Sequence, residues 1–176
     1  MKKTGLMLVI VAIVLSLSSC NYKNKYEEKA EEFINLYYAQ YEKKSEIEEI
    51  FNFNEDIISD ETDALIYGIH DGNFDKKIED FIGRNFGDIL TKDEKLRLIS
   101  NRVIPNADII NSDIIKATVS SIEFDEINNQ NEGTLSFSTI IINEHLDGEN
   151  TKCEKSGIIR LVKDGDNLKV DYFKFN

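Results

Sequence analysis

The chain has 176 residues, with 33 acidic and 21 basic side chains, so its formal net charge is −12 at neutral pH. A surface this acidic is repelled by phosphate backbones and by anionic lipid headgroups. The composition therefore argues against nucleic-acid binding and against membrane attachment through a basic surface. The length suits a single domain that needs no disulfide or metal to stabilise it.

The first 19 residues have the three-part form of an export signal. Lys2 and Lys3 form a basic head, residues 6–17 are apolar apart from Ser16, and small residues follow. As a helix, this apolar segment would be about 18 Å long, against roughly 30 Å for the hydrocarbon core of a bilayer. It is therefore short for a membrane span.

Residues 17–20, Leu-Ser-Ser-Cys, resemble the bacterial lipobox, in which an aliphatic and two small residues precede a cysteine. The resemblance implies that the Cys20 thiol receives a diacylglyceryl group and that cleavage makes Cys20 the first residue of the mature protein. Two or more acyl chains give stable anchoring at the outer face of the cell membrane. The alternatives are a plain secretory signal with an incidental cysteine, or an uncleaved anchor.

These features divide the chain into a signal peptide (1–19), a lipidated tether (20–25) and one α+β domain (26–176). Loss of both signal-peptide lysines takes the net charge from −12 to −14. Cys153 is then the only free thiol, so no intrachain disulfide is possible. We expect a buried or half-buried strand cysteine; a reactive thiol or an interchain disulfide is the alternative.

Aromatic and apolar side chains recur at helical spacing over residues 26–41, which predicts a helix with one buried face. Such a stripe is typical of a protein core. Tyrosines also suit the wall of a half-hydrated groove, since the ring is buried while the hydroxyl stays in water. Tyr37, Tyr38 and Tyr41 are therefore candidate ligand-groove residues. The predicted buried face consists of Tyr26, Ala30, Phe33, Ile34, Tyr37 and Tyr41.

Capping patterns and helical spacing predict further helices in the first half of the chain. A turn at Asp71-Gly72-Asn73 interrupts them, because glycine after aspartate favours a turn. The last helix should end before Pro105, because the residue preceding a proline disfavours helical geometry. The predicted starts are Ser45, Ser59 or Asp60, Phe74 and Thr91.

The second half changes to the period-two alternation of strands. Asp147-Gly148 and Asp164-Gly165 separate alternating runs, which is a strong hairpin signal. Sequential strands joined by short turns imply an antiparallel meander. The preceding helices must cover one face of this sheet, so the predicted fold is α+β, with N-terminal helices packed on a C-terminal four-stranded antiparallel meander sheet. The runs cover residues 115–119, 135–141, 157–162 and 168–175.

This order of elements is similar to the cone-shaped fold of the nuclear-transport-factor-like, or cystatin-like, superfamily. The residues that carry the resemblance are the helix over 26–41 and the two Asp-Gly hairpins. In that superfamily a curved sheet wraps a long helix and leaves a pocket at the open end. Its members include small-molecule enzymes, binding modules and many bacterial surface lipoproteins, so the resemblance selects no function.

His70 and His145 are candidates for acid–base catalysis, because the pKa of histidine lies near neutrality. Asp71 and Glu144 are their acidic neighbours in sequence. Consecutive strand residues point to opposite faces, so Glu144 is not expected to orient His145. Both histidines lie near predicted turns, and we expect them at the surface.

Residues 71–75 supply oxygen ligands at alternate positions, like the start of a calcium loop, but Lys76 and Ile82 stand where glycine and glutamate are required. We interpret the segment as a turn and a helix start. A second acidic group lies in the first turn of a predicted helix, where it would favourably meet the helix dipole; it consists of Asp60, Glu61 and Asp63. The sequence predicts no metal and no cofactor.

The sequence therefore predicts a lipid-anchored, extracytoplasmic protein of the bacterial envelope that is not an enzyme. Its partners would be the membrane, through Cys20, and a protein, peptide or small apolar ligand, with no nucleic acid. One alternative is a small cone-fold enzyme that uses a carboxylate or histidine in a sheet-lined pocket. The other is an accessory component of an envelope assembly.

Overall fold

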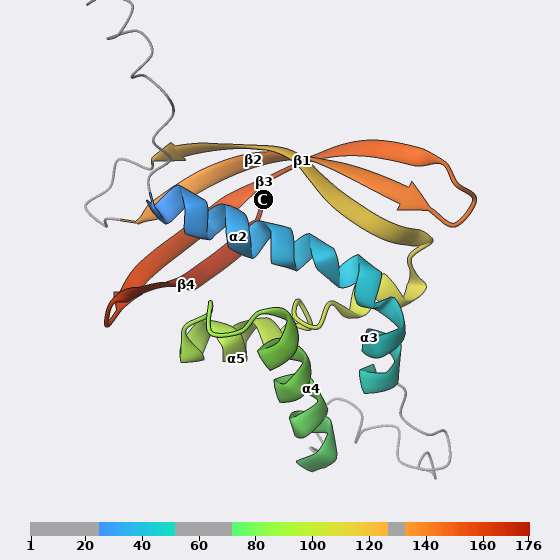
Figure 1. The fold of residues 1–176 in the computed structure, drawn as a ribbon, viewed down its shortest axis with the longest axis horizontal. Coiled ribbons are helices and arrows are strands. Elements are labelled where there is room, and N and C mark those ends of the chain that lie inside the picture. Colours follow the sequence, from blue (N-terminus) through green and yellow to red (C-terminus); the bar gives the residue numbers. More distant parts are fainter. Residues whose placement is uncertain (1–24, 52–71, 127–132) are drawn as a thin grey trace, which may run out of the picture.

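The computed structural model describes residues 25–51, 72–126 and 133–176 and has the predicted α+β architecture, with helices preceding a four-stranded antiparallel sheet (Figure 1). The predicted helix starts at Ser59 or Asp60, His70 and the acidic group at 60–63 lie outside the described residues. The elements are α2 (Lys25–Ala39), η1 (Gln40–Lys43), α3 (Lys44–Phe51), α4 (Gly72–Asn85), α5 (Lys92–Ser100), η3 (Ala107–Asn111), β1 (Ile114–Glu126), β2 (Thr134–His145), β3 (Asn150–Asp164) and β4 (Asn167–Phe175).

The sheet is a simple meander in the order β1-β2-β3-β4. Its β2–β3 and β3–β4 turns lie at the predicted Asp-Gly pairs. Gly148 and Gly165 have positive φ angles of 83° and 63°, which residues with a Cβ adopt at a cost. The meander prediction is confirmed because short turns between sequential strands permit only adjacent antiparallel pairing.

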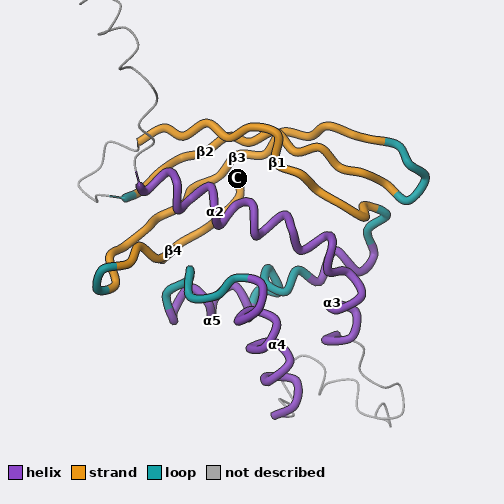
Figure 2. The backbone as a smooth tube through the Cα atoms, in the orientation of Figure 1, coloured by secondary structure: helices purple, strands orange, loops and turns teal. Residues whose placement is uncertain are grey.

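All described helices lie on one side of the sheet, which we call its inner face (Figures 1 and 2). Phe33 of α2 is fully buried and meets the ring of Phe173 in β4 edge-on, at 4.9 Å between ring centroids. Phe137 of β2 stacks on the same ring at 5.9 Å. The predicted amphipathic stripe of α2 therefore joins the helix to the centre of the sheet.

Two predicted helix starts differ from the structure. Ser45 does not begin a helix, because the chain runs from η1 directly into α3 at Lys44, with Ala39 and Lys44 both in helical geometry. The predicted helix over 26–41 correspondingly ends as an α-helix at Ala39 and tightens into η1. The helix predicted from Phe74 begins at Gly72, so residues 72 and 73 of the predicted turn are helical, and Asp71 lies outside the described residues.

Thr91 is the N-cap of α5, as predicted, and its hydroxyl accepts a hydrogen bond from the Glu94 backbone N–H at 3.3 Å. The reciprocal half of the predicted capping box is wrong. The Glu94 side chain is buried and pairs with Arg97 and with the backbone of Phe173 instead of returning to Thr91. A buried strand edge within reach provides that carboxylate with a stronger set of donors.

Candidate functional site

The candidate groove tyrosines lie at the boundary between α2, η1 and the sheet. Tyr37 packs against Tyr38 at 5.2 Å and against Phe175 of β4 at 5.2 Å between ring centroids. Burial raises the pKa of both tyrosines well above the ordinary value. The Tyr37 hydroxyl accepts a hydrogen bond from the Asn106 amide at 3.4 Å. These two rings therefore contribute mainly to the packing between helix and sheet.

Tyr41 lies in η1 and is half-buried. Burial raises its pKa, and the nearby Cys153 and Asp108 raise it further. Cys153 lies in β3, is half-buried, and its sulfur accepts a hydrogen bond of 3.6 Å from the Asn143 amide. Tyr41 and Cys153 thus belong to one partly covered region of the inner face.

His145 lies in the same region, at the end of β2, and its side chain is 16 % exposed. Its Nδ1 is 3.0 Å from Oδ2 of Asp113, and its Nε2 is 2.7 Å from Oγ1 of Thr151. Glu144, the adjacent acidic residue in sequence, is on the opposite face, as strand alternation requires. His145 is therefore half-buried, whereas the sequence predicted a surface position, and its imidazole is held between two partners.

Three separate segments form this arrangement. Asp113 precedes β1 and Thr151 is the second residue of β3. The hydrogen bond from His145 holds the pKa of the exposed Asp113 carboxyl below its usual value. Neither partner was predicted from the sequence. The register that places Asn143 opposite Thr151 would have indicated Thr151, but no local pattern pointed to Asp113, which is 32 residues from His145.

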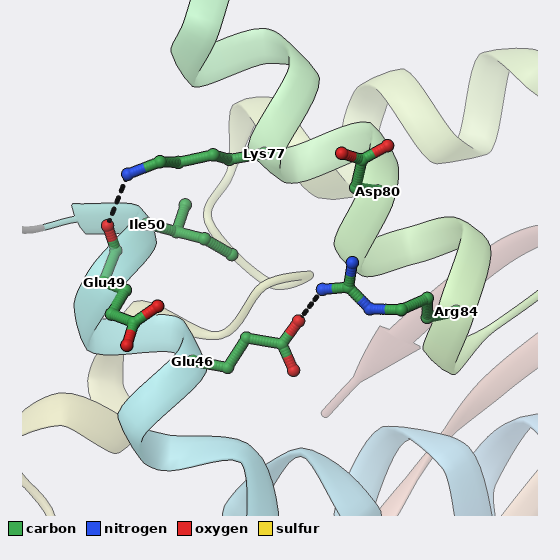
Figure 3. Close-up of a pocket in the computed structure, with 6 residues that line it drawn as sticks. All are labelled: Glu46, Glu49, Ile50, Lys77, Asp80 and Arg84. Carbon is green, nitrogen blue, oxygen red and sulfur yellow. Dashed lines mark hydrogen bonds and ion pairs between the residues drawn. The ribbon is translucent and has the colours of Figure 1, made fainter.

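A shallow polar hollow of about 110 Å³ lies between α3 and α4 (Figure 3). Lys77 donates to the backbone oxygen of Glu49 at 3.1 Å, and Arg84 pairs with Glu46. Figure 3 shows both bridges crossing from one helix to the other. The cations of this hollow already hold groups of the facing helix, and the candidate tyrosines do not line it. The lining residues are Glu46, Glu49, Ile50, Lys77, Asp80 and Arg84.

The outer face of the sheet carries hydroxyl, aliphatic and charged side chains, and no described helix lies over it (Figure 2). Along β2, the buried residues alternate with half-buried or exposed ones, and the latter face outward. Ile142 is 42 % exposed. Ile158 of β3 lies opposite Ser136 and adds to the same surface. The β2 part of this face consists of Thr134, Ser136, Ser138, Ile140, Ile142 and Glu144.

Within residues 25–51, 72–126 and 133–176, no three His, Cys, Asp or Glu side chains are grouped so that they could hold a metal ion. The same part of the chain contains no helix that is both long and apolar enough to cross a membrane. Cys20 lies outside it. Comparisons with protein-family models, curated proteins and solved structures gave no match.

Proposed function

We propose that this protein is a lipid-anchored component of the bacterial cell envelope, and that its extracytoplasmic domain binds a protein partner through the outer face of the sheet. The observation that carries the proposal is the asymmetry of the sheet. The helices bury its inner face, while no described helix covers its outer face, which includes the exposed Ile142. If the protein partner belongs to a larger envelope complex, this protein would be an accessory component of that assembly.

The anchoring part of the proposal rests on the lipobox-like residues 17–20. Helix α2 begins at Lys25, only a few residues after Cys20. Even a fully extended tether of this length reaches only about 17 Å, so the domain would lie close to the bilayer. The acidic surface would not adhere to anionic lipids, so attachment would depend on the acyl chains.

The binding part rests on the shape and chemistry of the outer face. A small ligand is normally held in a concave pocket that buries most of its surface. The outer face presents instead a strip of hydroxyl and isoleucine side chains along β2, including Ser138 and Ile140, with the charged Glu154 beside Ile140 on β3. Such a surface suits a protein partner, whose own side chains can cover it.

Metabolic labelling with an alkyne fatty acid tests the anchor. We expect label on the wild-type protein and none on a Cys20→Ala variant. A Cys153→Ala variant is the matched control and should be labelled as strongly as wild type. Equal labelling of the Cys20→Ala and wild-type proteins would overturn the anchoring proposal.

Site-specific photo-crosslinking in living cells tests the binding surface. A photoreactive residue at Ser138, on the outer face, should give one discrete crosslinked band that an Ile142→Asp substitution weakens. The same residue at Leu96, which is exposed on α5, is the control and should not give that band. An identical band from both positions, or no effect of Ile142→Asp, would contradict binding through the outer face.

The Asp113–His145–Thr151 arrangement favours a second candidate, a small hydrolytic enzyme. The order carboxylate, imidazole, hydroxyl is that of a nucleophilic triad. Thr151 Oγ1 would attack an ester carbonyl carbon and pass its proton to His145 Nε2, which would give it to the alcohol that leaves as the ester C–O bond breaks. A water molecule deprotonated by the same imidazole would then attack the acyl group, free it as the acid and restore the Thr151 hydroxyl. A fluorophosphonate probe should then label the wild-type protein and not a Thr151→Val variant. We favour the binding function because Asp113 is 71 % exposed, which screens its charge from the imidazole.

A further inference from the structure

The free edges of β4 and β1, at the two sides of the sheet, differ in how their backbone groups are hydrogen-bonded. The free edge of β4 is closed at two residues. Val170 exchanges hydrogen bonds with the backbone on either side of Leu90, at 2.8 and 2.9 Å. The Phe173 N–H donates to the Glu94 carboxylate, and the Phe173 carbonyl accepts from Arg97. In the described part of the chain, no hydrogen bond joins the free edge of β1 to another element. β1 therefore presents an open backbone template, which is the feature by which sheets recruit another strand.

The hydrogen bonds of β1 define which of its residues face that open edge. The carbonyl oxygens of Ser121 and Asp125 accept bonds from hydroxyls of β2, at 2.9 and 3.3 Å, so both residues face β2. Successive residues alternate in direction. Ile122 and Phe124 therefore turn their N–H and C=O groups away from β2, toward the free edge.

A β-bulge in the middle of β1 reverses this alternation. Val119 lies opposite Ile141 and Ser121 opposite Ile140, so β1 advances two residues where β2 advances one. Ser121 faces β2, hence Ile140 faces β1 and Ile141 faces away from it. Val119 consequently faces the open edge, and two residues earlier Ala117 does so too.

The bulge makes β1 complementary to a reversed copy of itself. With a two-fold axis between Ser120 and Ser121, Val119 lies opposite Ile122 of the second copy and Ala117 lies opposite Phe124 of the second copy. All four residues turn their backbone groups outward, so each opposed pair can exchange hydrogen bonds. An axis through Ser120 itself would oppose outward-facing to inward-facing residues, and no ladder would form.

The side chains match in the same register. On the inner face, the half-buried Val119, Ile122 and Phe124 would be covered by one another across the axis. On the outer face, Lys116 would lie opposite Asp125 of the second copy. In the single chain, Lys116 forms a half-exposed ion pair with Glu42, at 3.4 Å, which holds it weakly.

We propose that two copies of this chain associate through β1, antiparallel, with the two-fold axis between Ser120 and Ser121. The two sheets then form one continuous sheet of twice the width. A closed, isologous interface of this kind is the commonest way in which identical chains associate. It would also satisfy the row of unpaired backbone groups that the β1 edge otherwise exposes. This inference does not depend on the proposed lipid anchor or on the outer-face partner.

Disulfide trapping with the full chain in detergent tests the register. Two differently tagged Cys153→Ser chains are mixed and oxidised, one with Lys116→Cys and the other with Asp125→Cys. These positions would form a non-hydrogen-bonded pair with Cα atoms about 4.5 Å apart, within the disulfide range. We expect a disulfide between the two tags. Two Lys116→Cys chains should not crosslink, since their cysteines would be roughly 30 Å apart. The Cys153→Ser chain alone controls for Cys20.

Charge exchange provides a test that does not depend on oxidation. Lys116→Asp or Asp125→Lys alone would place like charges opposite each other and should weaken association about tenfold, whereas the double variant should recover it. Light scattering coupled to size-exclusion chromatography would measure the mass. A monomer at every concentration, as expected if the edge instead pairs with a foreign peptide, would overturn the proposal. Crosslinks between two Lys116→Cys chains that match the mixed ones would also overturn it.

Discussion

Glu94, which is 2 % exposed, accepts a 2.7 Å hydrogen bond from the backbone N–H of Phe173, a residue 79 positions later in the chain. Arg97 donates to both oxygens of the same carboxylate at 2.6 Å and also donates to the carbonyl oxygen of Phe173. One buried carboxylate and its arginine therefore close the edge of β4 at Phe173 and fix α5 to the sheet.

Glu94→Ala should lower the free energy of unfolding by about 2–4 kcal/mol, because it leaves the Phe173 N–H and the Arg97 guanidinium without their acceptor. Urea denaturation followed by circular dichroism measures this. Glu79→Ala is the control, since Glu79 forms a half-exposed ion pair with Lys95 and should cost under about 1 kcal/mol. Equal losses from the two variants would show that the contact with β4 does not stabilise the fold.

Gly157 allows β3 to pass close to its neighbours. A Cβ at this position would overlap the Lys174 carbonyl oxygen and lie 2.6 Å from the Phe137 ring. Gly157→Ala should therefore destabilise the protein by about 1–3 kcal/mol, measured as a shift in the urea midpoint. Gly83→Ala, on an exposed face of α4 with open space around it, should instead stabilise by about 0.5–1 kcal/mol. A neutral Gly157→Ala would contradict the close approach.

The Asp113–His145 contact predicts a dependence of stability on acid. The hydrogen bond from His145 lowers the pKa of Asp113 in the folded state. Its stabilisation is then present above the ordinary carboxyl pKa of about 3.9 and is lost as the pH falls through the lower, folded value. Asp113→Asn should lower the urea midpoint at pH 6 and have no effect once the pH is well below 3. Asp166→Asn, in the exposed β3–β4 turn, should have no effect at either pH.

The buried tyrosines predict sensitivity to alkali. Burial raises the pKa of Tyr37 and Tyr38 in the folded state. Their neutral rings stabilise the fold fully below the unfolded pKa of about 10, and this contribution falls as the pH rises above it. Tyr37→Phe should therefore shift the alkaline unfolding midpoint upward, as followed by absorbance at 295 nm. A midpoint unchanged from that of the wild-type protein would show that Tyr37 ionises without cost.

Part of the candidate region was visible in the sequence. The tyrosine stripe of residues 26–41 predicted a helix packed on the sheet, and strand alternation separated Glu144 from His145. The sequence did not reveal the Asp113 partner of His145 or the hollow between α3 and α4. The Asp113–His145 contact depends on the pairing of β1 with β2, which places Ile114 opposite His145, and the hollow depends on α3 packing beside α4.

The order and type of the elements followed from the sequence alone, because hydrophobic period, Asp-Gly turns and the Thr91 cap act between residues close together in the chain. Ser45 and Glu94 show the limit of such patterns. Ser45 matches a helix start, yet the helix already runs through it, and Glu94 matches a capping box, yet its carboxylate turns to β4. Only the tertiary structure decided these outcomes, since a side chain takes the best donors within its reach, and packing determines which donors those are.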